Sequence, residues 1–159
     1  MCSDCVNAAI AAEDAKATRA MKRVNWLPAP HYFNLNHACC LINDALGSFG
    51  CYLVGSCLLR RDYRDVDVRF IMANDKFEGM FPGAKDRPDM NALWALMCSS
   101  ISLFLSTHSG LPVDFQIQAQ SVANAEFDQK GGHERQPLGF FLKPTPRDYA
   151  ASMADGDSK

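Results

Sequence analysis

A strict alternation of apolar and polar residues at positions 65–70 constrains the fold of this chain more than any other feature. The apolar members are Val66, Val68 and Phe70, and the polar members are Asp65, Asp67 and Arg69. Because successive side chains of a β-strand point to opposite faces, the segment predicts a strand with one face in the core. The other face carries two carboxylates and is expected to line a cleft.

Residues 111–118 show the same alternation in a second predicted strand. Its apolar side chains are Val113, Phe115 and Ile117, and its polar ones are Asp114, Gln116 and Gln118. A third predicted strand, Cys51–Val54, is short and apolar, and the turn Gly55-Ser56 follows it directly. A carboxylate therefore stands on the polar face of each of the two longer strands.

Helical spacing of apolar residues predicts two main helices beside these strands. One has its N-cap at Asn34 and ends at Leu46, with Gly47 just past its end. The other starts near Asn91 and carries serine rather than charge on its second face. Residues 73–89 hold two glycines, two prolines and seven charged residues, so a surface excursion is expected there. Together these elements predict an α/β (α+β) fold, a small mixed sheet flanked by helices.

Length and composition fit one globular domain, with 159 residues of which 48% are hydrophobic. We expect a peripheral N-terminal helix or arm at 1–30, the folded domain at 31–142, with its apolar residues 138–142 docked on the core, and a flexible C-terminal tail at 143–159. Sixteen basic and eighteen acidic residues, with pI near 6.0, give no net field that would draw the chain to nucleic acid or an anionic membrane. Any attraction for phosphate must be local.

Seven cysteines and the lack of a recognisable secretory signal favour reduced thiols in a cytoplasmic protein. Cys2 and Cys5 have the spacing of metal ligands, and His37, Cys39 and Cys40 would complete a zinc site. The second pair lacks the usual spacing of two intervening residues, so buried thiols are the favoured interpretation. The stretch 90–113 contains no charged residue, but polar residues are spread along it and Pro112 closes it. A buried or partner-facing helix is expected there, and no membrane span.

Asp65, Asp67 and Asp114 suit the chemistry of phosphoryl or nucleotidyl transfer. Mg²⁺ needs hard oxygen ligands, and two carboxylates one residue apart on a strand face the same way, so a third from a neighbouring strand completes a two-ion site. Gly55 allows a close backbone approach to a phosphate, and Ser56 offers a hydroxyl and an amide. Three arginines could neutralise the leaving phosphates: Arg60, Arg61 and Arg64.

This pattern resembles the polymerase-beta-like nucleotidyltransferase superfamily, and most of all its minimal, single-domain members. The family pattern is an apolar strand, Gly-Ser, a short basic stretch, Asp-x-Asp on the next strand and a third Asp on a later one. The matching residues are Val54-Gly55-Ser56, Asp65-Val66-Asp67-Val68 and Val113-Asp114-Phe115, and the similarity covers residues 33–118. Many small members have Arg-Gly and a serine just before the first Asp, whereas here the stretch reads Leu59-Arg60-Arg61-Asp62-Tyr63-Arg64.

The resemblance implies that Asp65 and Asp67 bind two Mg²⁺ ions, or Mn²⁺ in their place. It implies that Asp114 binds the catalytic ion and helps to deprotonate the acceptor hydroxyl, while Gly55 and Ser56 contact the triphosphate of the NTP. Arg69 is interpreted either as a phosphate contact or, preferably, as a partner that neutralises Asp67. Two other Asp-x-Asp chemistries, haloacid-dehalogenase-type phosphotransfer and glycosyl transfer, place the pair after an apolar run, whereas here the run follows it.

The expected function is metal-dependent transfer of a nucleoside monophosphate from an NTP such as ATP to an acceptor hydroxyl, with release of pyrophosphate. The acceptor, whether a small molecule, RNA or protein, is left open. The chain has little room for a second domain, so a partner protein or a second copy is expected to bind, with the helix at 91–108 as the candidate surface. The alternative is a non-catalytic, nucleotide-binding or antitoxin-like interaction module that keeps the nucleotidyltransferase fold.

Overall fold

The computed structural model describes residues 25–127 and 135–140 and has a mixed α and β architecture, which confirms the predicted fold class. The strands are β1 (Gly50–Val54), β2 (Val66–Met72), β3 (Val113–Ala119) and β4 (Gln136–Leu138). They form one sheet in the order β3-β2-β1-β4, in which β2 and β3 are parallel and β1 is antiparallel to both β2 and β4. The predicted N-terminal helix before residue 24 and the tail at 143–159 lie outside the described residues.

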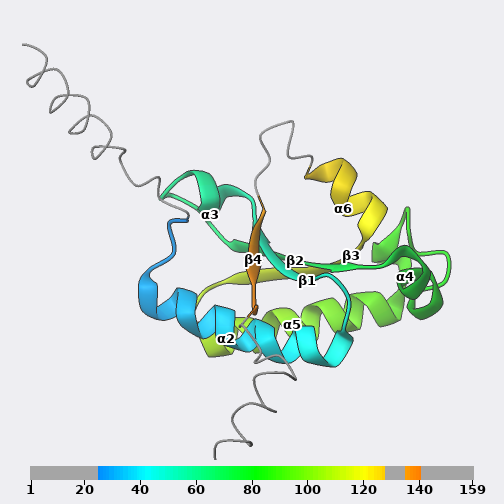
Figure 1. Cartoon of the computed structure of the whole chain (residues 1–159), viewed down its shortest axis with the longest axis horizontal. Coiled ribbons are helices and arrows are strands. Elements are labelled where there is room, and N and C mark those ends of the chain that lie inside the picture. Colours follow the sequence, from blue (N-terminus) through cyan, green and yellow to red (C-terminus); the bar gives the residue numbers. More distant parts are fainter. Residues whose placement is uncertain (1–24, 128–134, 141–159) are drawn as a thin grey trace, which may run out of the picture.

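Helices lie on both sides of this sheet (Figure 1). The two long helices, α2 (Ala29–Leu46) and α5 (Ala92–Ser109), pack side by side under one face. The short helices α3 (Ser56–Leu59) and α6 (Gln120–Glu126) stand on the other side, and α4 (Asn74–Met80) with the 3₁₀ turn η1 (Pro88–Met90) lies at one end. The core therefore fills one side of the sheet, and the side with α3 and α6 stays partly open.

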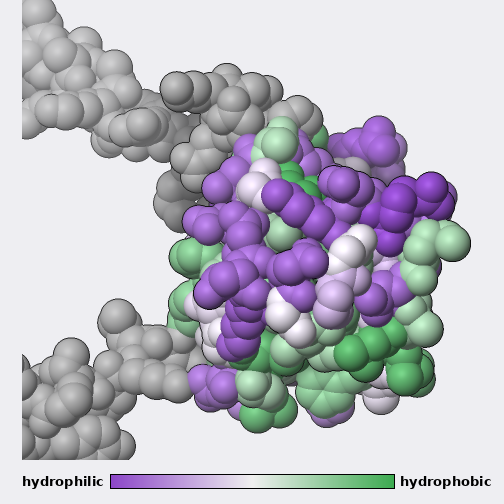
Figure 2. Space-filling view, turned by 90° about the vertical axis from the view of Figure 1, so that its right-hand side faces the viewer, coloured by the Kyte–Doolittle hydropathy of each residue, from purple (hydrophilic) through white to green (hydrophobic). Residues whose placement is uncertain are grey.

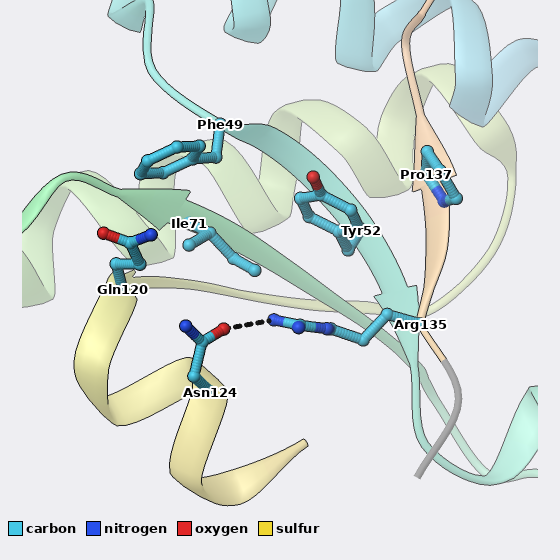
Figure 3. Close-up of a pocket in the computed structure, with 7 residues that line it drawn as sticks. All are labelled: Phe49, Tyr52, Ile71, Gln120, Asn124, Arg135 and Pro137. Atoms are coloured by element: carbon cyan, nitrogen blue, oxygen red, sulfur yellow. Dashed lines mark hydrogen bonds between the residues drawn. The ribbon is translucent and has the colours of Figure 1, made fainter. Parts of the chain in front are cut away.

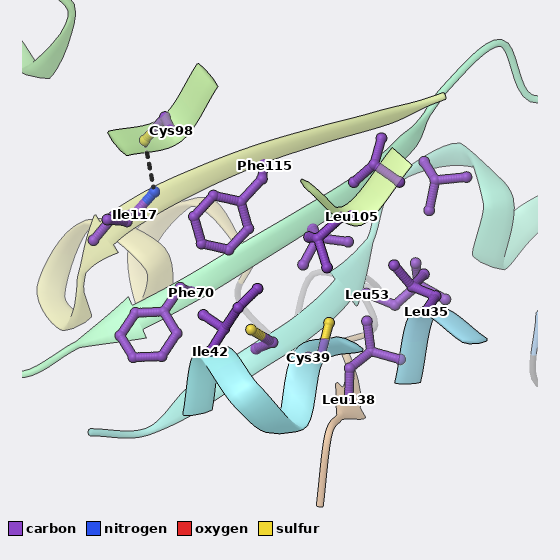
Figure 4. Packing of buried hydrophobic residues seen from close by; sticks show 14 of the residues in the cluster. Leu35, Cys39, Ile42, Leu53, Phe70, Cys98, Leu105, Phe115, Ile117 and Leu138 are labelled. Carbon is purple, nitrogen blue, oxygen red and sulfur yellow. Dashed lines mark hydrogen bonds between the residues drawn. The ribbon is translucent and has the colours of Figure 1, made fainter. Parts of the chain in front are cut away.

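The core contains the strand residues that the alternation pattern assigned to it. Val66, Val68 and Phe70 are fully buried, and Phe115 and Ile117 pack beside them. Helices α2 and α5 add aliphatic and thiol side chains to the same cluster (Figure 4). Apolar burial of this extent is the main favourable contribution to folding.

Helix α2 begins six residues earlier than the sequence predicted. Asn34 is not its N-cap: Pro28 stands in that position, and Pro30 lies in the first turn. Proline is tolerated there because the N–H groups of the first turn have no acceptor within the helix. The other end agrees with the prediction, since Gly47 has φ 47° and donates its N–H to Asn43 at 2.9 Å.

The segment 73–89 is less irregular than its composition suggested. It contains helix α4, whose Phe77 packs against Phe81 with ring centroids 5.3 Å apart, and both rings are buried. Residues Gln120–Glu126 form the short helix α6, and Leu138 in β4 is fully buried against the core. Periodicity over 73–89 is hidden because only three of its side chains are buried, those of Phe77, Phe81 and Ala84.

Helix α5 seals the outer edge of β3 with its polar side chains. Ser106 and Ser102 accept hydrogen bonds from the backbone N–H groups of Val113 and Phe115 at 3.0 and 2.9 Å, and the Cys98 thiol accepts one from Ile117 at 3.4 Å. An edge strand with unpaired N–H groups invites pairing with another chain, so these contacts protect it. This part of the serine face is turned inward and is not a free surface.

The outward side of α5 carries exposed leucines among polar residues. Leu93, Leu96 and Leu103 are 49%, 65% and 71% exposed, and hydrophobic residues gather along the lower part of Figure 2, on the side where α2 and α5 lie. By length and composition alone, α5 is the one helix among the described residues that could cross a bilayer, a test that core helices also pass.

Buried thiols in this core are expected to resist alkylation in the folded protein. Burial raises the pKa of Cys57 and of Cys98 to about 11. Both groups are therefore protonated at pH 8, and only the thiolate reacts at a useful rate. Iodoacetamide at pH 8 followed by peptide mass spectrometry should label these two cysteines slowly in buffer and fully in denaturant. Fast labelling of Cys57 in the folded protein would contradict this packing.

Candidate functional site

The strand register collects polar side chains on the open face of the sheet. Asp67 lies directly opposite Asp114 of the parallel neighbour β3, and Arg69 lies opposite Gln116. On the other side, Tyr52 of β1 lies opposite Arg69. The carboxylates stand at the end where β1 finishes and β2 and β3 begin, next to α3. The polar faces predicted for the two longer strands are thus one continuous surface.

Arg69 joins the two opposed carboxylates. Its guanidinium forms ion pairs with Asp67 Oδ1 at 3.0 Å and with Asp114 Oδ2 at 3.1 Å, and it donates a further hydrogen bond to the Asp114 carbonyl at 3.1 Å. The arginine is only 7% exposed. A guanidinium suits this position because its planar, forked donors reach two acceptors at once. The preferred interpretation of Arg69, as a partner that neutralises Asp67, therefore applies to Asp114 as well.

Asp65 has a different environment from Asp67. Its carboxylate is paired with Arg64 at 3.1 Å, but the Arg64 side chain is 92% exposed. Arg60 and Arg61 are also exposed, in the loop that follows α3, and Arg60 approaches Asp62 at 3.8 Å. The three loop arginines are therefore solvent-facing groups near the site, and only Arg64 contacts one of its carboxylates.

Gly55 lies directly against the side chain of Asp67. It has φ 77°, in the left-handed region that favours glycine. A Cβ at this position would overlap Oδ2 of Asp67, far inside van der Waals distance. The glycine was expected to give a phosphate access to the backbone, and here it gives room to the carboxylate. Ser56 is the first residue of α3 and is partly exposed.

The electrostatics of the site favour an additional cation. Burial raises the pKa of Asp67, Arg69 opposes this, and Asp65 and Asp114 raise it further. Three carboxylates stand beside one buried guanidinium, which pairs with Asp67 and Asp114, so a formal charge of about −2 remains before exposed groups are counted. In addition, Arg69 Nε and Gln118 Oε1 are buried without a hydrogen-bond partner among the described residues. The face is therefore incompletely satisfied by its own side chains.

The donors match a divalent cation in type and charge, but they are not drawn together around one point. Within 25–127 and 135–140, no three His, Cys, Asp or Glu side chains are close enough to form a ready metal cluster. Asp65, Asp67 and Asp114 offer the carboxylate oxygens that Mg²⁺ prefers. Of the residues considered for zinc, Cys39 is buried and His37 is exposed, and Cys2 and Cys5 lie outside the described residues.

Asp114 also borders a shallow depression of about 250 Å³ beside the outer edge of β3. Helix α5 contributes Ser99 and Ser102 to its lining, which also includes Asp89. Arg69 is not among the residues that line this depression, so a ligand bound in it could contact Asp114 without displacing Arg69. No local pattern indicates this depression, because it depends on how α5 packs against β3.

The double pairing of Arg69 was the main feature that sequence reasoning missed. The period of two placed Arg69 on the same face as Asp67, which was a usable signal. The contact with Asp114 required the parallel register of β2 and β3, which no local pattern encodes. Comparison of the chain with protein-family models, with curated proteins and with solved structures finds no match.

Proposed function

We propose that this protein is a metal-dependent nucleotidyltransferase that transfers a nucleoside monophosphate from an NTP to an acceptor hydroxyl. The observation that supports this best is the direct opposition of Asp67 and Asp114 on parallel neighbouring strands, with Asp65 two residues before Asp67. Carboxylates arranged at one end of neighbouring strands can hold cations against a triphosphate. The Gly55-Ser56 turn lies at the same end of the sheet, directly after β1.

In this proposal each residue has a defined task. Asp65, Asp67 and Asp114 hold Mg²⁺ or Mn²⁺, which neutralises charge on the phosphate oxygens. The oxygen of the acceptor hydroxyl forms a bond to the α-phosphorus, and its proton passes to Asp114. The bond between the α-phosphorus and the oxygen that bridges to the β-phosphate breaks, and pyrophosphate leaves. The exposed arginines 60, 61 and 64 are suited to contact the departing pyrophosphate, because their side chains are largely free to reorient.

The alternative is a non-catalytic nucleotide-binding or antitoxin-like module, and Arg69 is the observation that favours it. An internal guanidinium already neutralises part of the charge on Asp67 and Asp114 at 3.0 and 3.1 Å. A fold that had lost its cation would need such a replacement. The retention of Asp65 beside this pair, with a formal negative charge left over, favours the enzyme.

Label transfer from α-³²P-labelled NTPs in the presence of Mg²⁺ tests the proposal. The double variant Asp65→Ala/Asp67→Ala is expected to lower label transfer to RNA, to the protein itself or to small-molecule extracts by roughly a hundredfold or more. Asp62→Ala is the matched control, because that side chain is 83% exposed and contacts only a loop arginine. Nucleotide binding that depends on Asp67 without any transfer would support the non-catalytic module, and the absence of both would refute the proposal.

A further inference from the structure

A second hollow lies on the same open face of the sheet, between β1, β2 and α6. It measures about 300 Å³. Its lining, drawn in Figure 3, consists of Phe49, Tyr52, Ile71, Gln120, Asn124, Arg135 and Pro137. We propose that this hollow, the base pocket, receives the heterocyclic base of the nucleotide whose phosphates lie at the carboxylates. The inference rests on the proposed function and names the part of the substrate that this pocket recognises.

The base pocket offers flat surfaces for stacking. Phe49 is 42% exposed, although an aromatic ring of this size is normally buried. The guanidinium of Arg135 stands over the ring of Tyr52, with its central carbon 5.8 Å from the ring centroid. Nucleic acid bases stack on both aromatic rings and guanidinium planes, and the energy depends little on which base is present.

The wall formed by α6 carries side-chain amides that can form hydrogen bonds with the edge of a heterocyclic base. Gln120 and Asn124 extend from α6 toward the pocket, and Asn124 Oδ1 accepts a hydrogen bond from Arg135 at 3.1 Å (Figure 3). A side-chain amide both donates and accepts, which matches the mixed donor and acceptor pattern of a base edge. Arg135 is the only charged residue among the described residues that line the pocket. A flat, nearly neutral ring therefore suits it better than a polyphosphate does.

The distance between the base pocket and the carboxylates fits one nucleotide. Tyr52 lies opposite Arg69, two residues beyond Asp67 on β2, and Ile71 lies four residues beyond. At about 3.3 Å per residue, the pocket extends from about 7 to about 13 Å from Asp67 along the sheet. This separation leaves space for a ribose between phosphates at Asp67 and a base beside Phe49. Both ends lie on one face, so the nucleotide need not bend around a strand.

The base pocket can be tested by separating the binding of the base from the binding of the phosphates. The probes are a non-hydrolysable NTP analogue and inorganic tripolyphosphate, titrated calorimetrically with Mg²⁺ into the full chain. Phe49→Ala is expected to raise the Kd of the nucleotide about tenfold and to leave the Kd of tripolyphosphate unchanged. Asn124→Ala should change the ranking of analogues with different bases. Asp67→Asn should weaken both probes.

Phe33→Ala is the matched control, because Phe33 lies on α2, away from the open face, and is 65% exposed. Circular dichroism verifies that each variant is folded. If the wild type binds the nucleotide through Asp67 but Phe49→Ala and Asn124→Ala behave like Phe33→Ala, the base pocket is refuted and the proposed function stands. The same conclusion follows if the nucleotide binds no more tightly than tripolyphosphate. If the wild type binds neither probe, the proposed function and the base pocket fail together.

Discussion

Replacement of Arg69 by methionine is expected to lower the free energy of unfolding by about 3 kcal/mol, the lower end of the range for breaking a buried ion pair. Arg69 is 7% exposed and holds two carboxylates at 3.0 and 3.1 Å. Its removal leaves both Asp67 and Asp114 without their nearest cation. The effect stays at the lower end because the Asp114 side chain is 43% exposed and water screens part of its charge.

Urea unfolding of Arg69→Met, monitored by circular dichroism, measures this loss. Arg64→Met is the matched control: its side chain is 92% exposed and pairs with one carboxylate, so a change within about 0.5 kcal/mol is expected. Asp114→Asn, added to Arg69→Met, should restore part of the stability because it removes one of the uncompensated charges. Equal losses for Arg69→Met and Arg64→Met would show that the bridge contributes little.

Mg²⁺ gives the same variant a second readout. If Asp65, Asp67 and Asp114 hold a divalent cation, the ion should stabilise Arg69→Met more than the wild type, because it replaces a missing positive charge as well as binding to the folded state. Thermal unfolding in Mg²⁺ and in EDTA would show this as a larger difference in Tm for the variant. An identical difference in both proteins would mean that Arg69 and the cation do not share these carboxylates.

The sequence predicted the sheet and its polar face well because both depend on local patterns. Alternation over 65–70 and 111–118 requires only the geometry of a single strand, and each predicted core residue of these segments is buried. The same reasoning placed Asp67 and Asp114 on polar faces. It could not place them opposite each other, because the register that pairs Asp67 with Asp114, 47 positions further along the chain, depends on α5 and the whole core.

Errors in the prediction came from groups that local pattern assigns to the wrong neighbour. Asn34 has the chemistry of an N-cap, but Leu27, before the helix, is buried against the core and Pro28 caps α2 instead. Ser102 and Ser106 read as a polar outer face, yet they satisfy backbone N–H groups of β3. A polar side chain at helical spacing indicates that it has a hydrogen-bond partner but does not say which one. The sequence pattern is the same whether that partner is water or the backbone of an edge strand. The hollow proposed as the base pocket was missed for a different reason: its lining comes from segments far apart in the sequence, at and next to β1, β2, α6 and β4.

Replacement of Gly55 by alanine is the second change with a large expected effect, a loss of about 3 kcal/mol in the free energy of unfolding. Part of the loss, about 1–3 kcal/mol, comes from the backbone at φ 77° and ψ −155°, a region that residues with a Cβ rarely adopt. The rest comes from the contact that the new Cβ would make with Oδ2 of Asp67. Gly83→Ala is the control for a positive φ alone, because Gly83 has φ 69° and a Cβ added there would meet no other part of the described chain within 4 Å.

A double-mutant cycle with Asp67→Ala separates the second part. In that background the carboxylate is gone, so Gly55→Ala should cost only the part that comes from the backbone conformation. Gly55→Ala alone should also weaken nucleotide binding, because relief of the overlap requires Asp67 to move away from its position opposite Asp114. A cost for Gly55→Ala that is the same with and without Asp67 would show that the glycine serves the turn alone. A cost that falls to the backbone part once Asp67 is removed would show that the Gly-Ser turn and the Asp-x-Asp strand are coupled, and that the glycine determines where the carboxylate stands.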